Sequence, residues 1–149
     1  MNYKLLKDQA RELLKEEPYF VSFFSNLSSI IFNQLEDLNW AGFYLVRNDA
    51  LVIGPFQGKP ACIHIQSNKG VCGTSFYTKK SIIVKDVHKF QGHIACDSAS
   101  NSELVVPIFK DNKVMALLDL DSPKFARFTE EDKIGFEELF REIEQKIIY

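Results

Sequence analysis

Three cysteines, Cys62, Cys72 and Cys96, are the side chains of this sequence most able to carry redox chemistry. Their spacing contains no Cys-x-x-Cys pair, which counts against a zinc site of the usual paired kind. The histidines of the chain could still complete a Cys/His ligand set: His64, His88 and His93. A free cysteine is also often a small buried hydrophobe, and this interpretation suits Cys62 better than Cys96.

Cys96 lies in a polar segment, residues 92–100, that the sequence predicts to be a loop, where a thiol can reach a ligand. A charged His93 would lower the pKa of this thiol and Asp97 would raise it, so the local sequence leaves the balance open. Cys72 stands between two glycines at the predicted start of a short helix. Backbone N–H groups at a helix N-terminus can stabilise a thiolate or a ligand carboxylate, although a bare Gly-x-x-Gly is a weak signal alone.

Asp119 and Asp121 end an apolar strand and share one of its faces, because side chains alternate along a strand. A three-residue hairpin loop would place Glu103 opposite one of these aspartates, whereas a two-residue loop at 111–112 would place it opposite Leu120, on the other face. In the first case three carboxylates crowd together, and their repulsion raises at least one pKa, which makes a proton donor available near neutral pH. Solvated carboxylates at a strand end are the alternative interpretation.

Helices are predicted at both ends of the chain. The first covers residues 4–15, which are rich in helix formers, and Pro18 enforces its end. The apolar residues of the second recur every three or four positions: Phe20, Phe24, Leu27, Ile31 and Leu35. Thr129 can cap the last helix, whose first turn is acidic. Its apolar stripe consists of Phe136, Phe140, Ile143 and Ile147.

Between these helices the pattern changes to short strands. They are predicted at Trp40–Val46, Leu51–Ile53, Ala61–Ile65, Ile82–Val84, Ser102–Lys110 and Lys113–Asp121. We expect a loop at Gly54–Pro60, a short helix at Gly70–Lys79 and a long loop at 86–101. A long loop in a small domain is more often functional than idle.

This order of elements predicts an α+β fold with a mostly antiparallel sheet and the N- and C-terminal helices packed on one face. We expect one domain over residues 1–149. Residues 1–38 would supply the N-terminal helices, 39–128 the sheet and the active-site loops, and 129–149 the C-terminal helix.

Charge and hydropathy exclude several classes of function. Eighteen basic and twenty acidic side chains leave a net charge of −2, without the basic excess that binding to nucleic-acid phosphates requires. We find no apolar run of about 18 residues to span a membrane, and no apolar leader that predicts secretion. The odd number of cysteines argues against a disulfide scaffold, so we expect a cytoplasmic protein with thiols that are reduced at rest.

Six segments, taken together, form a specific set: Asn39–Tyr44, Gly54–Cys62, Gly70–Thr74, Gly92–Ser98, Ser102–Pro107 and Leu118–Pro123. This set resembles the free methionine-(R)-sulfoxide reductases, a family built on a GAF domain. A generic GAF domain would not carry all six segments with three cysteines at these gaps.

The resemblance implies a role for each cysteine. Cys96 matches the cysteine that attacks the sulfoxide sulfur, and Cys62 matches the one that resolves the oxidised product. Cys72 matches a third cysteine, for binding or for an alternative disulfide.

The resemblance also assigns the acids and two aromatic residues. Glu103, Asp119 and Asp121 match the cluster that holds the substrate amine and the sulfoxide oxygen, and we expect Asp121 or Glu103 to donate the proton. Trp40 and Tyr44 match the aromatic wall around the methyl end of the substrate. They stand four apart on a predicted strand, so they share a face.

The implied activity is reduction of free L-methionine (R)-S-oxide through a cysteine sulfenic acid and an intramolecular disulfide, which thioredoxin or a similar dithiol recycles. We expect no cofactor and no metal, and the resemblance favours a homodimer. A GAF module that senses a small molecule without chemistry is the alternative, but such a module does not require three thiols and three acids in these places.

Overall fold

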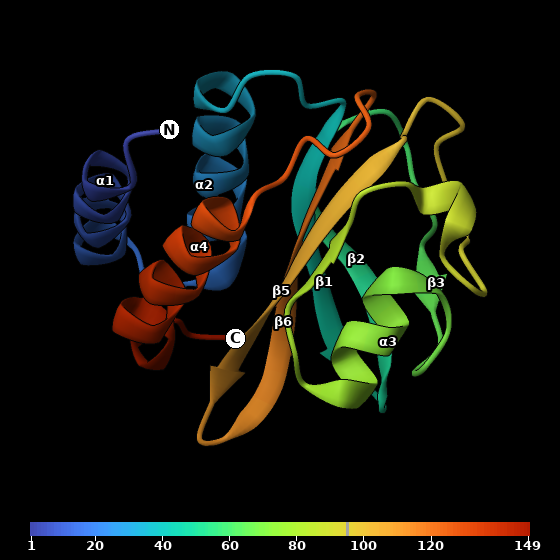
Figure 1. Cartoon of the computed structure of the whole chain (residues 1–149). Helices are drawn as coiled ribbons and strands as arrows, with labels where there is room; N and C mark the ends of the chain where they lie inside the picture. The colour runs from blue at the N-terminus through green and yellow to red at the C-terminus, as the bar shows by residue number, and fades with distance from the viewer. Residues whose placement is uncertain (95) are drawn as a thin grey trace.

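A curled antiparallel sheet organises the computed structural model, which describes residues 1–94 and 96–149 (Figure 1). Its strands follow the spatial order β3-β2-β1-β6-β5-β4. They are β1 (Trp40–Arg47), β2 (Ala50–Gly58), β3 (His64–Ile65), β4 (Ile82–Val84), β5 (Ser102–Lys110) and β6 (Lys113–Ser122). Each neighbouring pair in the sheet is antiparallel, in agreement with the sequence.

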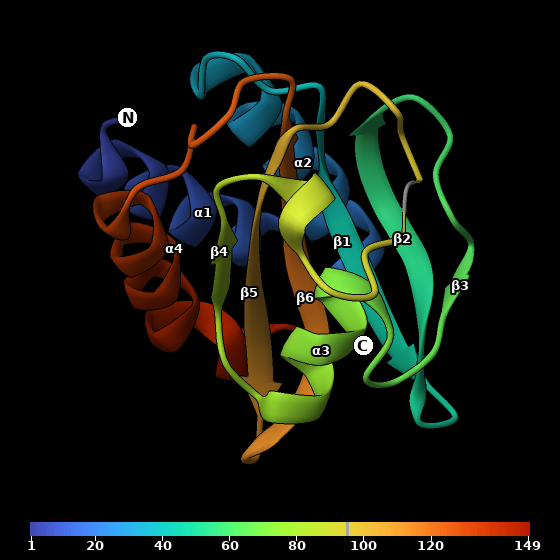
Figure 2. The ribbon, with the colours of Figure 1, turned by 45° about the vertical axis from the view of Figure 1, so that its right-hand side comes forward.

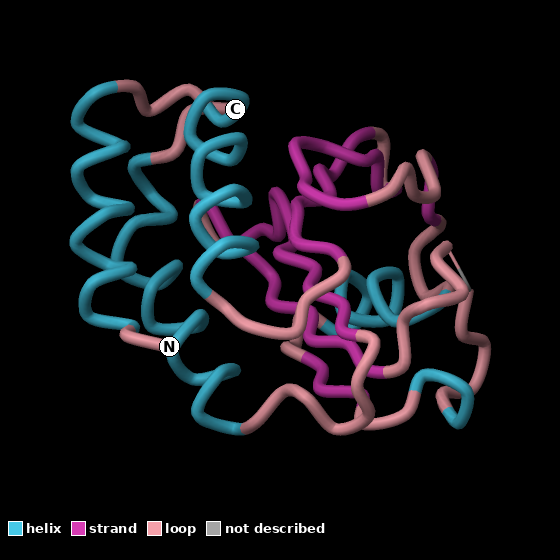
Figure 3. The backbone as a smooth tube through the Cα atoms, turned by 90° about the horizontal axis from the view of Figure 1, so that it is seen from above, coloured by secondary structure: helices cyan, strands magenta, loops and turns pink. Residues whose placement is uncertain are grey.

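Long helices cover one face of the sheet and a short helix covers the other (Figures 1 and 3). The long helices are α1 (Tyr3–Glu16), α2 (Phe20–Gln34) and α4 (Glu130–Ile143). The short helix α3 (Gly70–Thr78) and a 3₁₀ turn at Val87–Lys89 lie over the opposite face (Figure 2). The terminal helices thus share one face of an antiparallel sheet, which confirms the predicted α+β fold.

The apolar periodicity of the terminal helices produces the core on their side of the sheet. Phe24 of α2 is fully buried and stacks on Phe43 of β1, with ring centroids 4.0 Å apart. Thr129 caps α4 through a capping box with Asp132, and Asp132 also accepts a hydrogen bond of 2.6 Å from the Tyr3 hydroxyl of α1. Cap and core together fix α1 and α4 to each other and to the sheet.

The prediction of a loop at Gly54–Pro60 is wrong for the part up to Gly58, because β2 ends only at Gly58. Gly42 pairs with Phe56 and Tyr44 pairs with Ile53, so Gly54 and Pro55 together face a single residue of β1. This is a β-bulge, the position at which a strand tolerates a proline that donates no ladder hydrogen bond.

The hairpin between β5 and β6 has the two-residue loop of one predicted alternative and the pairing of Glu103 with an aspartate of the other. Its loop has two residues, Asp111 and Asn112, both with positive φ as a type I′ turn requires. A bulge then inserts Met115 between the pairs Ile108–Ala116 and Phe109–Val114. The inserted residue shifts the register by one, so Glu103 faces Asp121 despite the two-residue loop. The expectation that such a loop puts Glu103 on the other face is therefore wrong.

The remaining elements differ little from the prediction. Only His64 and Ile65 of the predicted strand Ala61–Ile65 form β3, by pairing with β2. The predicted loop 86–101 contains the 3₁₀ turn, and its residue Ala95 lies outside the described residues. Among the helices of the described chain, none has the length and apolar character needed to cross a membrane.

Candidate active site

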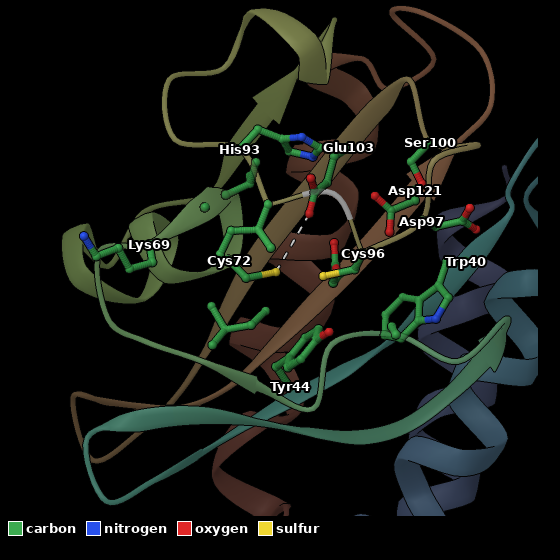
Figure 4. A pocket seen from close by; sticks show the side chains of 16 residues that line it. Trp40, Tyr44, Lys69, Cys72, His93, Cys96, Asp97, Ser100, Glu103 and Asp121 are labelled. Carbon is green, nitrogen blue, oxygen red and sulfur yellow. Dashed lines mark hydrogen bonds between the residues drawn. The ribbon is translucent and has the colours of Figure 1, made fainter.

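A small pocket lies between the sheet and the layer formed by α3 and the loop before β5 (Figure 4). Strands β1, β5 and β6 form its floor, and it is covered by α3 and by five residues of the loop before β5: His93, Ile94, Cys96, Asp97 and Ser100. The three acids and two aromatic residues that the sequence singled out line this pocket, and two of the three cysteines do so too. These lining residues are Trp40, Tyr44, Cys72, Cys96, Glu103, Asp119 and Asp121. The sheet register and the long loop therefore bring together residues as far apart in the sequence as Trp40 and Asp121.

Cys62 and Cys96 form a disulfide beside this pocket, with their Cα atoms 5.4 Å apart. Cys62 belongs to the connection between β2 and β3, and Cys96 belongs to the loop before β5. The hydroxyl of Tyr44 donates a hydrogen bond of 2.9 Å to the carbonyl oxygen of Cys62, which fixes this connection against β1. The interpretation of Cys62 as an inert buried thiol is wrong in this state, because both cysteines are partly exposed and oxidised.

Cys72 is the free cysteine of the described residues, and it is buried in the first turn of α3. Its thiol donates a hydrogen bond to Oε1 of Glu103 across a distance of 3.8 Å. Burial raises the pKa of the Cys72 thiol well above its usual value, and the charges of Asp119 and Glu103 raise it further. Cys72 therefore holds its proton at neutral pH and acts here as a hydrogen-bond donor to the acid cluster.

The three acids lie side by side on the floor of the pocket. Glu103 of β5 pairs with Asp121 of β6, and Asp119 lies two residues away on the same face. Burial raises the pKa of Glu103 well above its usual range, and the charges of Asp119 and Asp121 add to this. Burial also raises the pKa of Asp119 and of Asp121. Because neighbouring carboxylates resist ionising together, the cluster retains a proton well above the pH at which a free carboxyl loses it.

The acid cluster has no countercharge among the residues that the structure describes. None of the ion pairs formed within residues 1–94 and 96–149 involves Glu103, Asp119 or Asp121. Oδ1 of Asp119 is buried without a hydrogen-bond partner in that part of the chain. A buried acceptor without a partner costs free energy, so a cationic or N–H-bearing ligand would gain by binding here.

Trp40 and Tyr44 form an aromatic wall at one side of the pocket, as the period of two along β1 predicts. Their rings stack at a centroid distance of 5.9 Å, and Trp40 also stacks on Phe56 of β2 at 5.1 Å. Gly42 makes this stacking possible, because a Cβ atom at its position would lie 2.3 Å from Cβ of Phe56 and 2.7 Å from the Trp40 ring.

Asn39, directly before β1, is hydrogen-bonded to the loop that carries Cys96, a role that its residue type does not predict. Nδ2 of Asn39 donates hydrogen bonds of 3.0 Å to Oδ2 of Asp97 and to Oγ of Ser100. Asp97 in turn accepts a hydrogen bond from the backbone of Ala99. The signal in the sequence was the position of Asn39 directly before the aromatic strand.

His93 lines the pocket, but its pKa does not favour the charged histidine that the sequence left open as a means to lower the pKa of the Cys96 thiol. Burial lowers the pKa of His93, and the charge of His88 lowers it further. A histidine with a pKa below its usual value is mostly neutral at pH 7. It therefore supplies little positive charge to lower the pKa of the Cys96 thiol.

A metal-ligating arrangement exists at one place in the described residues. Ligand atoms of Cys72, Glu103 and Asp119 all lie within 4.8 Å of one another. This set shares only Cys72 with the Cys/His set that the sequence left open, because Cys62 and Cys96 are joined in the disulfide. It also coincides with the acid cluster, so a cation there would compete with any amine-bearing ligand.

Known proteins are similar to this chain in both sequence and fold. The GAF domain family matches residues 23–147. The chain is 45% identical over 143 residues to the free methionine-R-sulfoxide reductase of Escherichia coli, a match that covers 96% of this chain and 87% of that protein. The fRMsr of Staphylococcus aureus in complex with substrate is 46% identical with a TM-score of 0.92, covering 99% of this chain and 96% of that one.

A second structure extends this result. The free methionine-R-sulfoxide reductase of Neisseria meningitidis in complex with its substrate is 36% identical with a TM-score of 0.92, covering 97% of this chain and 87% of that one. These relatives share the fold of this chain over nearly its whole length. This chain belongs to the free methionine-R-sulfoxide reductase family and is built on a GAF domain.

Proposed function

We propose that this protein is an oxidoreductase that reduces free L-methionine (R)-S-oxide to L-methionine. One observation carries the proposal: the Cys62–Cys96 disulfide lies beside a pocket whose acid cluster has no countercharge among the described residues. The disulfide is the oxidised product that such a reaction leaves on the enzyme. The acids are the groups that a free amino acid, with its ammonium group, would satisfy.

The reaction begins on the reduced enzyme with the Cys96 thiolate, which attacks the sulfoxide sulfur. A protonated carboxyl group of the cluster, Glu103 or Asp121, gives its proton to the sulfoxide oxygen. The hydroxyl group then passes from the substrate sulfur to Sγ of Cys96 while the bond between the two sulfurs breaks, so methionine leaves as the thioether and Cys96 becomes a sulfenic acid. The raised pKa values of both carboxyls support this role, because each keeps a proton available near neutral pH.

Cys62 then completes the reaction. Its thiol attacks the sulfenic sulfur of Cys96, water leaves, and the disulfide forms. Cys62 is the better resolving cysteine because it is bonded to Cys96 here, whereas the Cys72 thiol is buried and donates to Glu103. An external dithiol, thioredoxin or a similar protein, returns both cysteines to thiols by exchange.

Recognition of the free amino acid follows from charge and shape. An ionised carboxylate, Asp119 first among them, would hold the substrate ammonium, since its Oδ1 has no hydrogen-bond partner among the described residues. Backbone N–H groups at the start of α3 would receive the substrate carboxylate. Trp40 and Tyr44 would enclose the methyl end. A methionine residue within a protein lacks both charged groups, so this pocket would exclude it.

The pocket is small in the disulfide form. Its free volume is about 40 Å³, which is space for a few water molecules. Cleavage of the Cys62–Cys96 bond would free the loop that carries Cys96 to admit the next substrate.

A turnover assay with dithiothreitol and the separate epimers of free methionine sulfoxide tests the proposal. We expect methionine from the R epimer and none from the S epimer, with Cys96→Ser as the matched inactive variant. Equal rates on both epimers, or preference for peptide-bound sulfoxide, would contradict the assignment. Binding of the sulfoxide without any turnover would favour the sensing module instead.

A further inference from the structure

Two exposed isoleucines flank the disulfide. Ile63, directly after Cys62, is 59% exposed and does not line the pocket, whereas Ile94, two residues before Cys96, is 41% exposed and lines it. The disulfide holds the two cysteine Cα atoms 5.4 Å apart, so the two isoleucine-bearing segments are neighbours although the cysteines are 34 positions apart in the sequence. Single exposed apolar side chains are ordinary, whereas apolar side chains that gather on one surface mark interaction sites.

The two cysteines of the disulfide differ in their relation to the pocket. Among the described residues that line the pocket, Cys96 is present and Cys62 is not (Figure 4). Cys62 is partly exposed, and the next two residues, Ile63 and His64, are exposed. A partner that attacks Cys62 therefore does not need to enter the pocket.

The charge around the disulfide restricts the kind of partner that fits. Residues 59–69 and 87–96 contain three lysines and three histidines but no acidic residue. Lys59, Lys69 and Lys89 are all exposed. Asp86 and Asp97 border the second segment, so the three lysines leave a small basic excess, which favours a partner whose dithiol lies within an acidic or neutral surface.

We propose that Ile63 and Ile94 form the docking surface for a dithiol protein of the thioredoxin type, whose thiolate attacks Sγ of Cys62. This inference rests on the proposed function, because it concerns recycling of the same disulfide. The attack breaks the Cys62–Cys96 bond, forms a mixed disulfide on Cys62 and releases Cys96 as a thiolate. The second thiol of the partner then attacks the mixed disulfide and releases Cys62, so the partner is oxidised by two electrons and the enzyme is reduced by two.

Steady-state turnover with thioredoxin, thioredoxin reductase and NADPH tests the surface when the thioredoxin concentration is varied at saturating sulfoxide. Ile63→Asp should raise the KM for thioredoxin about tenfold. Its rate with dithiothreitol should match the wild type, since Ile63 does not line the pocket. Ile134→Asp is the matched control, because Ile134 is 48% exposed on α4, beyond the opposite face of the sheet.

Trapping tests the sulfur that is attacked. A thioredoxin whose second active-site cysteine is changed to serine should remain covalently attached to the oxidised enzyme. We expect peptide mass spectrometry to find the bond at Cys62. A bond at Cys96 would overturn the proposal.

The outcomes separate this inference from the proposed function. Absence of turnover with dithiothreitol in the wild type would refute the function. Normal turnover with dithiothreitol, combined with an unchanged thioredoxin KM in Ile63→Asp, would refute the docking surface alone. Size-exclusion chromatography checks the other occupant: if Ile63→Asp converts a dimer to a monomer, this face binds a second copy and the proposal is wrong.

Discussion

The two faces of the central sheet carry opposite kinds of side chain on the same strands. Toward α1, α2 and α4, strands β1, β5 and β6 present fully buried apolar residues such as Phe43, Val106 and Leu118. Toward α3, the alternating positions of β5 and β6 present Glu103 and Asp119 beside the cysteines. The period of two along each strand thus separates the two sets by a single backbone layer.

The contrast shows where this molecule obtains its stability and where it gives stability up. Apolar burial on the helix-covered face stabilises the fold in proportion to the area removed from water. Buried acids without a protein countercharge do the reverse, because desolvation of a carboxylate is costly. Substitutions on one face should therefore affect stability, and substitutions on the other should affect activity.

Among substitutions on the face of the sheet that holds the pocket, Cys96→Ser should cause the largest loss of activity. A hydroxyl at its ordinary pKa is a far poorer nucleophile than a thiolate, so we expect no product even in a single turnover. Cys62→Ser should instead release about one methionine per enzyme and then stall with thioredoxin. Product quantified after mixing reduced enzyme with one equivalent of sulfoxide separates the two variants. Sustained thioredoxin-driven turnover of Cys62→Ser would mean that Cys72 resolves the sulfenic acid.

Phe24→Ala should give the largest effect on the opposite face. Removing this buried ring, which stacks on Phe43, should lower the free energy of unfolding by about 3–5 kcal/mol. Because Phe24 lies across the sheet from the pocket, kcat measured well below the unfolding temperature should stay near the wild-type value. Urea unfolding and turnover at low temperature are the two measurements. A large loss of kcat in the folded variant would break the separation of the faces.

Glu103→Gln should raise the free energy of unfolding at neutral to basic pH, whereas most substitutions of buried residues lower it. The pKa of folded Glu103 lies above its ordinary value of 4.5, so the folded protein keeps a proton that the unfolded chain releases. Its stability must then fall as the pH rises above about 4.5 toward the raised value. The variant lacks the part of this fall that Glu103 contributes, while Asp119 and Asp121 keep theirs, so it should be more stable than the wild type at pH 8 and similar at pH 4.

Urea unfolding of the reduced protein across this pH range is the measurement, with Glu16→Gln at an exposed site of α1 as the control. The same variant should lose about 10²-fold in kcat if Glu103 is the proton donor. Near-normal kcat would move that role to Asp121. A stability profile parallel to that of the wild type would contradict the electrostatic cost assigned to Glu103.

Most helices and strands could be predicted because their signals are local. The stripe of α2 and the cap of α4 depend on residues within a few positions of one another. The prediction for β2 was wrong for a physical reason. Gly54 and Pro55 are residue types typical of loops, and they form a β-bulge here only because β1 pairs with the residues on either side of them.

The register of Glu103 shows the same limit within the site. Chemistry suggested a cluster with Asp119 and Asp121, but the turn at 111–112 alone would have placed Glu103 on the apolar face. The bulge at Met115 corrects the register, and a bulge depends on packing between strands rather than on residue type. The pairing of Cys62 with Cys96 came only from the family resemblance, because no spacing rule joins cysteines in separate loops.

Asn39→Ala should give the smallest of these effects, and it tests the boundary between the two faces. Asn39 reaches the loop of Cys96 only through its amide, which donates to Asp97 and Ser100. Loss of both hydrogen bonds would let Cys96 drift from its attack geometry, and displacements of about 1 Å can cost up to 10²-fold in rate. We expect a smaller loss, about three- to tenfold in kcat, because the rest of the loop remains anchored.

The substitution Asn39→Asp distinguishes loss of these hydrogen bonds from simple loss of packing. An aspartate keeps the size of asparagine but removes the N–H donor and places a like charge beside Asp97. It should therefore lower kcat more than Asn39→Ala does, while the KM for the sulfoxide changes little in both. Asn33→Ala, at an exposed position of α2 where the amide donates only within its own helix, is the control. If Asn39→Asp retained wild-type kcat, the amide would not position Cys96, and the loop would depend on its remaining contacts alone.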